Sequence, residues 1–298
     1  MAVFTEGWAM VPWERIESSV YWLTFVAGFI LVAIWESQRP QRNLSSAVTR
    51  RWSRHGIILY ANMLVTVGVC RVSPVIVAVA MSHSRFGLLN KPWLAYPVRF
   101  IFGLLLLDLA RYGVHWSYHA VPFLWRFHYI HHSDPDFDLS SGVRAHPIEV
   151  ALTQGSNLAA VAILAAPPAA VLAAELFSCA QGFFSHANAS LPGWLEKPVR
   201  WVFVTPDMHR VHHSEEVQEQ WSNLGEIFPW WDRLFRTYLK APAAGQDQML
   251  FGIKGIQNDE SLKLSFMLLH PFRRQPEETV LQETPVTLHD SVTSARTH

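Results

Sequence analysis

Apolar runs alternate with polar segments over the first 185 residues of the chain. The first run, Ser18 to Trp35, contains no charged residue. A helix of this length rises about 27 Å at ~1.5 Å per residue, close to the thickness of a membrane hydrocarbon core. A second run, residues 56–82, is interrupted by Arg71 and Pro74, and a third covers residues 92–107. We expect all three runs to enter or cross a membrane as helices.

A fourth apolar stretch, residues 150–185, is divided by Pro167 and Pro168. Paired prolines do not fit the middle of a straight helix, because proline lacks the N–H group and its ring clashes with the preceding turn. The stretch therefore predicts a helical hairpin, with arms of marginal length for a full crossing. The expected fold is an all-α integral membrane protein with about four transmembrane helices, the last two forming the Pro-Pro hairpin.

Charged residues orient these helices. Five arginines and a single acid, Glu36, follow the first run: Arg39, Arg42, Arg50, Arg51 and Arg54. The positive-inside rule places this loop in the cytoplasm and the N-terminus outside. Because the hairpin leaves and returns on the cytoplasmic side, we expect residues 108–149 and 186–240 to form one cap there.

This cap and the spans are expected to make a single membrane-embedded catalytic domain, residues 1–240. Residues 241–274 are expected to form a C-terminal extension. The last segment, residues 275–298, is rich in Pro, Glu, Thr and Ser and is predicted to be a disordered tail.

Composition supports a membrane protein. Charged residues make up 16% of the chain, against about 25% in soluble domains. The net charge is zero, which offers no basic surface to nucleic acid. Cys70 and Cys179 both lie in apolar runs, so no disulfide framework is expected. No recognised retention signal is present, which favours a bacterial inner membrane, with the endoplasmic reticulum as the alternative.

Histidines gather in the polar segments. Eight of the fifteen lie within residues 115–132 and 209–213. They form an i, i+4 pair and two i, i+3, i+4 triads: His115 and His119; His128, His131 and His132; His209, His212 and His213. On helices each set projects from one face. Neutral imidazole binds Fe, Zn, Cu and Ni, and one metal takes about four to six donors, so eight histidines predict two metal ions side by side.

Further polar residues lie near these sets in the sequence. His186, at the end of the hairpin, is a candidate ninth ligand, and His146 is either a tenth ligand, a residue that supports a ligand, or purely structural. Ligating histidines usually donate their other N–H to an acceptor. Five acids are candidate acceptors, and the alternative for each is an ordinary cap or surface charge: Asp134, Asp136, Asp138, Asp207 and Asp232.

The spacing of the histidines can be compared with the patterns of other metal sites. The zinc-protease pattern His-Glu-x-x-His and the Glu-x-x-His repeats of carboxylate-bridged di-iron bundles do not occur. Bis-histidine haem ligation leaves most of the histidines unexplained. A metal-ion transporter stays an alternative, although transport sites usually lie at mid-membrane. A metal-dependent membrane hydrolase is a further alternative.

The three histidine sets, in this order and spacing, resemble the fatty acid hydroxylase and sterol desaturase superfamily of membrane non-haem di-iron oxygenases. The resemblance covers roughly Phe100 to Tyr238 and includes the segments DLARYGVHW, RAHPIE, SHANASLP and NLGEIFPWWDRLFRTY. Ser190 stands where the fatty-acyl and sphingolipid branch has a histidine, whereas His186 and Asn188 match the sterol-desaturase-like branch.

The resemblance implies four transmembrane helices beneath a cytosolic cap that binds two iron ions, with O₂ as co-substrate. It implies hydroxylation or desaturation of an unactivated C–H bond in a membrane lipid such as a sterol, fatty acyl or alkylglycerol compound. The implied metal ligands are the eight clustered histidines and His186, and the residues expected to support them are His146, Asn188 and Asp207. No cytochrome b5-like segment is seen, so electrons are expected from a separate cytochrome b5-like or ferredoxin-like donor.

Overall fold

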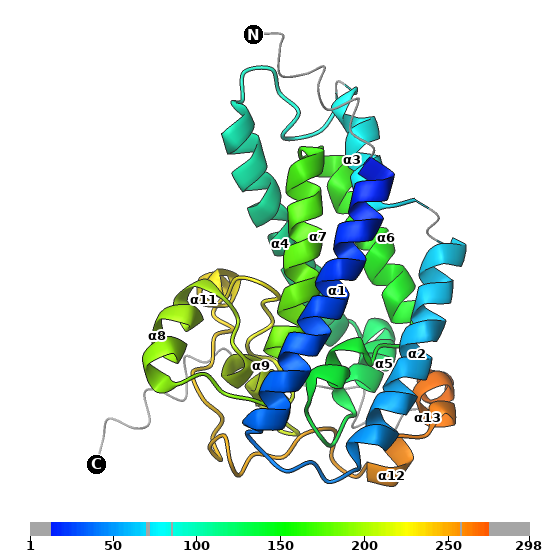
Figure 1. The fold of residues 1–298 in the computed structure, drawn as a ribbon, viewed down its shortest axis with the longest axis vertical. Coiled ribbons are helices and arrows are strands. Elements are labelled where there is room, and N and C mark those ends of the chain that lie inside the picture. Colours follow the sequence, from blue (N-terminus) through cyan, green and yellow to red (C-terminus); the bar gives the residue numbers. More distant parts are fainter. Residues whose placement is uncertain (1–12, 70–71, 85, 257, 274–298) are drawn as a thin grey trace.

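The computed structural model describes residues 13–69, 72–84, 86–256 and 258–273 (Figure 1). Their regular elements are helices, apart from an isolated bridge between Ser214 and Phe251. The all-α prediction is therefore confirmed over these residues. Long helices fill one half of the molecule, and short helices and loops form a cap at the other end (Figure 1).

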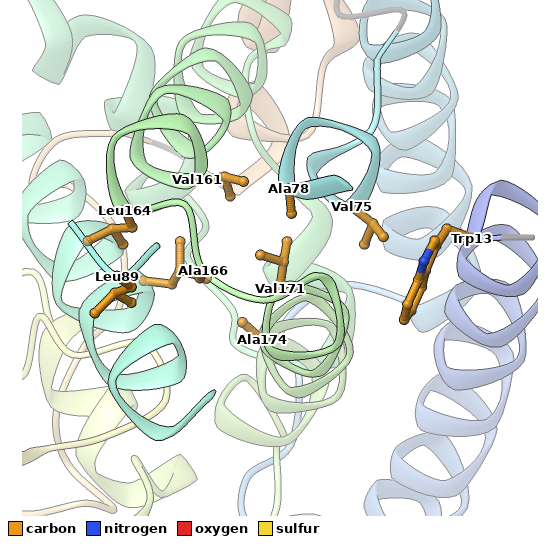
Figure 2. Packing of buried hydrophobic residues seen from close by; sticks show 10 residues of the cluster. Trp13, Val75, Ala78, Leu89, Val161, Leu164, Ala166, Val171 and Ala174 are labelled. Carbon is orange, nitrogen blue, oxygen red and sulfur yellow. The ribbon is translucent and has the colours of Figure 1, made fainter. Parts of the chain in front are cut away.

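Four long helices make the centre of the bundle: α1 (Trp13–Gln38), α4 (Tyr96–Ala120), α6 (Pro147–Leu164) and α7 (Pro168–Ser185). Helix α7 packs against α1, α4 and the short α3 (Pro74–Ser82). Small and β-branched side chains fill this core, among them Val75, Ala78 and Val171 (Figure 2). Such side chains allow helices to approach closely, which is typical of packing within a membrane.

The predicted second run is two helices in the structure. Helix α2 (Val48–Val69) begins well before residue 56, so its first turns belong to the cap. Helix α3 then starts at Pro74, where the hydroxyl of Ser73 accepts a hydrogen bond from the Ile76 N–H at 3.1 Å. Proline is favoured at the first position of a helix because its missing N–H would be unpaired there.

The prolines also define the hairpin, as predicted. Helix α6 ends at Leu164, Ala165 adopts a left-handed conformation with φ 48°, and Pro168 begins α7. The two helices run in opposite directions, so α7 returns to the cap (Figure 1).

Helix α4 carries the chain from the bundle into the cap. It passes the predicted boundary at residue 108 without interruption and ends at Ala120. Val121 is extended, with φ −104° and ψ 112°, and Pro122 begins α5 (Pro122–His132). The first two histidines are therefore fixed to a helix that is rooted in the bundle.

The remaining cap elements are short: η2 (Leu139–Val143), α8 (Gly193–Val202), α9 (Pro206–His212), α10 (Val217–Gln220), α11 (Trp230–Phe235), α12 (Asn258–Ser261), α13 (Leu264–Leu269) and η3 (His270–Phe272). Leu262, Phe266 and Met267, from the predicted C-terminal extension, share a core with Trp125 and Ile130 of α5. The predicted disordered tail, residues 275–298, lies outside the described residues.

Among the described helices, two are long and apolar enough to cross a membrane: Ile16–Gln38 and Pro147–Leu164. Large apolar side chains are exposed around the bundle, including Leu23 and Leu31 on α1 and Val67 on α2, at 68%, 66% and 73%. Exposed apolar side chains in this number are typical of helices that contact lipid or another protein.

Candidate metal centre

Nine histidines converge in the cap as two neighbouring groups. The first group is His115, His119, His128, His132 and His212, and the second is His131, His186, His209 and His213. Within each group the candidate ligand nitrogens lie within 4.8 Å of one another. The groups adjoin, because the rings of His132 and His213 stack with centroids 4.6 Å apart. The structure thus brings together all nine histidines that the sequence singled out as ligands.

Each triad is divided between the two groups. On α5, His128 and His132 are one turn apart and join the first group, whereas His131 joins the second. In the α9 triad the outer two histidines belong to the second group, and His212 belongs to the first. The i, i+3, i+4 spacing therefore lets one helical face serve two adjacent metal positions.

Local sequence fixes where the α9 triad starts. Pro206 occupies the first position of α9, and the Thr205 hydroxyl accepts a hydrogen bond from the Met208 N–H at 3.4 Å. Thr205 is fully buried. This N-terminal cap sets the helix phase, and with it the direction in which the three imidazoles project.

Backbone carbonyls orient two rings of the first group. His115 Nδ1 lies 2.8 Å from the Leu224 carbonyl, and His212 Nδ1 lies 2.9 Å from the Ser222 carbonyl. A carbonyl only accepts, so both Nδ1 atoms carry hydrogen and both Nε2 atoms carry a lone pair. These two Nε2 atoms face each other at 3.0 Å. Neither can donate to the other, so a shared cation is the partner that suits both.

The second group repeats this arrangement. His131 Nδ1 donates to the Arg144 carbonyl at 3.3 Å, and His186 Nδ1 donates to the Gly182 carbonyl at 2.8 Å. Their Nε2 atoms are 3.3 Å apart. A Cβ at Gly142 would lie 3.1 Å from His186 Nδ1, so glycine there lets η2 pack directly against this ring.

Burial favours the neutral form of several of these histidines. It lowers the pKa of His131, His212 and His213 well below the usual value, and the neighbouring imidazoles lower it further. The pKa of His186 falls to about 4, again through burial. Unprotonated nitrogens at neutral pH are what a metal ion requires.

Some buried ring nitrogens have no hydrogen-bond partner among the described residues: both nitrogens of His119 and Nδ1 of His132 and of His209. A buried polar atom without a partner costs about 1–3 kcal/mol. A bound metal would satisfy His119 through one nitrogen. The donor set, all imidazole and neutral, fits borderline transition metals such as iron or zinc.

One carboxylate contacts a ring of the cluster directly. Glu149, near the start of α6, accepts a hydrogen bond from His128 Nδ1 at 2.7 Å. Glu149 is not among the residues predicted from the sequence to support a ligand, although it is the last residue of the segment RAHPIE, which the resemblance includes. The missing signal was geometric, since Glu149 meets His128 only when α6 packs beside α5.

The residues expected to support ligands lie nearby but touch no ring of the two groups by a hydrogen bond in the described structure. His146 caps α6, accepting from the Ile148 N–H at 3.1 Å. Asn188 bonds the backbone of Arg42 through both ends of its amide, at 2.8 and 3.1 Å. Asp207 accepts from the Ser190 hydroxyl at 2.6 Å. Ser190, the residue that departs from the sphingolipid pattern, thus ties the loop after His186 to α9.

The other candidate acids act through the backbone or through arginine. Asp232 accepts from the Leu224 N–H at 2.7 Å and so holds the turn whose carbonyl orients His115. Burial raises the pKa of Asp232 to about 6. Asp136 accepts from Ser45 at 2.7 Å.

Asp134 and Asp138 surround the fully buried Arg51, with their closest contacts at 2.6 and 3.1 Å. His55 is also fully buried, and its Nδ1 lies 2.7 Å from the Ser140 hydroxyl. These contacts fasten the start of α2 to the loop that follows α5.

A cavity of about 390 Å³ opens onto the histidines. His115, His128, His131, His186 and His209 line it together with residues of α4, α6 and α7. Apolar and polar side chains both contribute to its walls. The bundle therefore provides a space that connects the two histidine groups with the region between the long helices.

Residues 100–237 match the family described as fatty acid hydroxylase, and this segment contains all nine histidines. Over this segment the chain is similar to the fatty acid hydroxylase superfamily. The proteins that the chain resembles include the ornithine lipid hydroxylase OlsE of Rhizobium tropici, 26% identical over 195 residues, which are 65% of this chain and 56% of the relative.

Two further relatives are alkylglycerol monooxygenases. The Caenorhabditis elegans protein is 26% identical over 87% of this chain and 48% of its own length, and the Homo sapiens protein is 26% identical over 61% and 39%. The chain thus spans about half the length, or less, of these relatives. No solved structure matches it.

Proposed function

We propose that this protein is an O₂-dependent oxidase of membrane lipids that hydroxylates or desaturates an unactivated C–H bond at a centre of two iron ions. The observation that carries the proposal is the pairing of Nε2 lone pairs, 3.0 Å apart in the first group and 3.3 Å apart in the second. Two adjacent, buried, neutral donor sets that adjoin a cavity suit a pair of redox-active metal ions better than they suit a closed structural metal site.

The nine histidines would hold the two ions, the first group one and the second group the other. Iron bound there would supply the redox chemistry with which O₂ attacks a C–H bond. The chain's own groups set the conditions for it. The carbonyls of Leu224 and Arg144 fix ring tautomers, the Glu149 carboxylate holds His128, and the buried surroundings keep bulk water away.

The substrate would be an amphiphilic lipid that enters the cavity from the bilayer. Ornithine lipid and alkylglycerol, which appear in the names of the relatives, are both lipids with a polar part. The placement of the cavity between long helices with exposed apolar faces supports entry from the membrane.

The protein would be a multi-pass membrane protein with about four crossings and its metal centre on the cytoplasmic side, in a bacterial inner membrane. Two helices long and apolar enough to span, and five arginines beyond the cap end of α1, support this orientation. Electrons would come from a separate carrier, cytochrome b5-like or ferredoxin-like.

A single purified preparation tests the proposal. Metal analysis should find about two iron ions per chain, and O₂ uptake should require both a reductant and a lipid extract, with mass spectrometry detecting a lipid gaining one oxygen or losing two hydrogens. Metal flux into vesicles without O₂ uptake would instead identify a transporter, and lipid cleavage without O₂ a hydrolase. Either result overturns the proposal.

Variants of the ligands give a second test. His131→Ala and His212→Ala remove one donor from each group and should abolish metal loading and oxidation together. Both variants should still insert in the membrane, because neither residue lies in the predicted spans. Normal turnover by either variant would contradict the ligand assignment.

A further inference from the structure

One wall of the cavity is polar and draws on three helices and a cap loop. Arg111 of α4, Asn157 of α6 and Glu175 and Ser178 of α7 line it, together with Glu226 from the loop before α11. Arg111 is the single cationic side chain among the described lining residues, against three glutamates. The cavity therefore offers more acceptors than a purely hydrocarbon ligand would use.

The acceptors on this wall are not equally occupied. Glu175 Oε1 accepts from Arg111 Nη2 at 2.5 Å and from Asn157 Nδ2 at 3.0 Å. Arg111 also donates to the Ala174 carbonyl at 3.1 Å. The single cation is thus bound to Glu175 and to the backbone, and its position is fixed.

Glu226 differs from Glu175. Its Oε1 accepts from the Ser178 hydroxyl, and Arg111 interacts with it electrostatically but makes no ion-pair contact with it in the described part of the chain. It follows Gly225, whose N–H is held by Asp232 at 3.0 Å, so the loop that carries it is anchored. Gly225, Glu226, His115 and His209 all line the same cavity. An acceptor with spare capacity therefore shares the cavity with the metal centre.

A second open acceptor lies in the same space. Glu149 lines the cavity, is 7% exposed, and its Oε2 has no hydrogen-bond partner among the described residues, while Oε1 holds His128. Burying a carboxylate oxygen against hydrocarbon alone is unfavourable, because the oxygen loses its water without gaining a donor. A ligand with O–H or N–H groups removes this penalty.

We propose that the cavity binds the polar, hydrogen-bond-donating part of an amphiphilic lipid, and that Glu226 is the residue that selects it. The donor is a hydroxyl or an ammonium group. This rests on the proposed function in that the ligand is taken to be the lipid to be oxidised. This binding mode places the C–H bond to be attacked near the polar part of the lipid, and the end of the lipid's hydrocarbon chain then lies towards the bilayer.

Binding to the full-length, metal-loaded protein in detergent micelles, without reductant, tests the inference. The probes are a hexadecyl glycerol ether, the same ether with both hydroxyls methylated, and hexadecylammonium. The native protein should bind at least one donor-bearing probe about tenfold more tightly than the methylated ether, as expected for a hydrogen bond to a charged acceptor. Glu226→Ala should lose this preference and should bind the methylated ether as the native protein does.

Two more variants complete the design. Glu226→Gln keeps an acceptor without the charge, so it should keep the preference for the glycerol ether if the donor is a hydroxyl, and lose the preference for hexadecylammonium if the donor is an ammonium. Glu216→Ala is the matched control, since Glu216 is exposed and pairs with Lys254 at 2.8 Å outside the cavity. It should bind all probes as the native protein does.

A native protein that binds the methylated ether as tightly as both donor-bearing probes would overturn the inference. So would a Glu226→Ala variant that retains the preference with full metal content. Because binding is measured without turnover, an absence of lipid oxidation would contradict the proposed function alone. Conversely, oxidation of lipids without any effect of Glu226 on probe preference would contradict only the role of Glu226.

Discussion

At the scale of single residues, Glu149 is the contact that most directly tunes the centre. Its carboxylate accepts from His128 Nδ1 at 2.7 Å, which fixes the tautomer and makes Nε2 the available donor. Loss of such a partner typically weakens metal affinity by about 10–100-fold. We therefore expect Glu149→Ala to lower iron affinity within that range, and Glu149→Gln to lower it less, because the amide oxygen still accepts.

Chelator competition measures this effect. Glu216→Ala serves as the control for removal of an exposed acid and should leave iron affinity unchanged. If Glu149→Ala retained native affinity, the carboxylate would have no part in holding His128 for the metal.

The histidines predict a loss of stability in mild acid. Their ordinary pKa is about 6.5, and burial lowers that of His186 to about 4 and that of His131 well below the usual value. Between pH 6.5 and pH 4 the unfolded chain binds protons that the folded chain does not, so the free energy of unfolding falls as pH falls. Denaturant unfolding of metal-stripped protein across this window measures the effect.

Bound metal should sharpen this dependence, because protons and metal compete for the same nitrogens. Metal content after dialysis should therefore fall over the same pH window. Unfolding that is independent of pH from 6.5 down to 4 would contradict the burial of neutral imidazoles.

At the scale of elements, Arg51 fastens α2 to the loop after α5. Burial alone would raise the pKa of Asp134, but Arg51 and Arg144 hold it well below its usual value. Removing one partner from a buried ion pair costs about 3–5 kcal/mol, because the remaining charge is left without compensation. Arg51→Met should therefore lower the free energy of unfolding by roughly that amount.

Arg54→Met is the matched control, since Arg54 lies on the same helix and is exposed. It should change stability by less than about 0.5 kcal/mol. A thermal or denaturant midpoint for Arg51→Met equal to that of Arg54→Met would show that the buried network does not hold the cap together.

Sequence pattern predicts local structure better than it predicts contacts between elements. The spacing of His128, His131 and His132 predicts one face of a helix, and α5 is a helix over these residues. This prediction succeeds because the spacing depends only on the local sequence. The division of the triad between two groups depends on how α5 packs against α4 and α9, which no local pattern encodes. For the same reason the sequence does not identify Glu149 as a partner of His128, and it does not reveal that the network around Arg51 buries His55.

The starts of the helices also differ in whether local sequence or contacts with other elements determine them. Prolines at Pro74, Pro122 and Pro168 mark boundaries that are legible in the sequence, because proline disfavours a helical interior and favours a first turn. The early start of α2 is not legible from apolar runs. Its first turns are polar, and they are helical because Arg51 and His55 find buried partners in the cap.

At the scale of the whole molecule, the bundle brings the nine clustered histidines to one end. Helices α4 and α7 both run towards the cap, and the loop between α3 and α4 lies at the opposite end (Figure 1). If the arginine-rich end faces the cytoplasm, a residue in the first turns of α2 and a residue in the α3–α4 loop must lie on opposite sides of the membrane. Ser53 and Phe86 are suitable positions, since both are exposed.

Single cysteines at these positions, in a background in which Cys70 and Cys179 are replaced by serine, test this topology. A membrane-impermeant maleimide should label Phe86→Cys in intact spheroplasts and should label Ser53→Cys only after the membrane is permeabilised. Labelling of both from outside would mean that the long helices do not separate the two ends across a bilayer. Labelling of Ser53→Cys alone would reverse the orientation and place the histidines on the outer face.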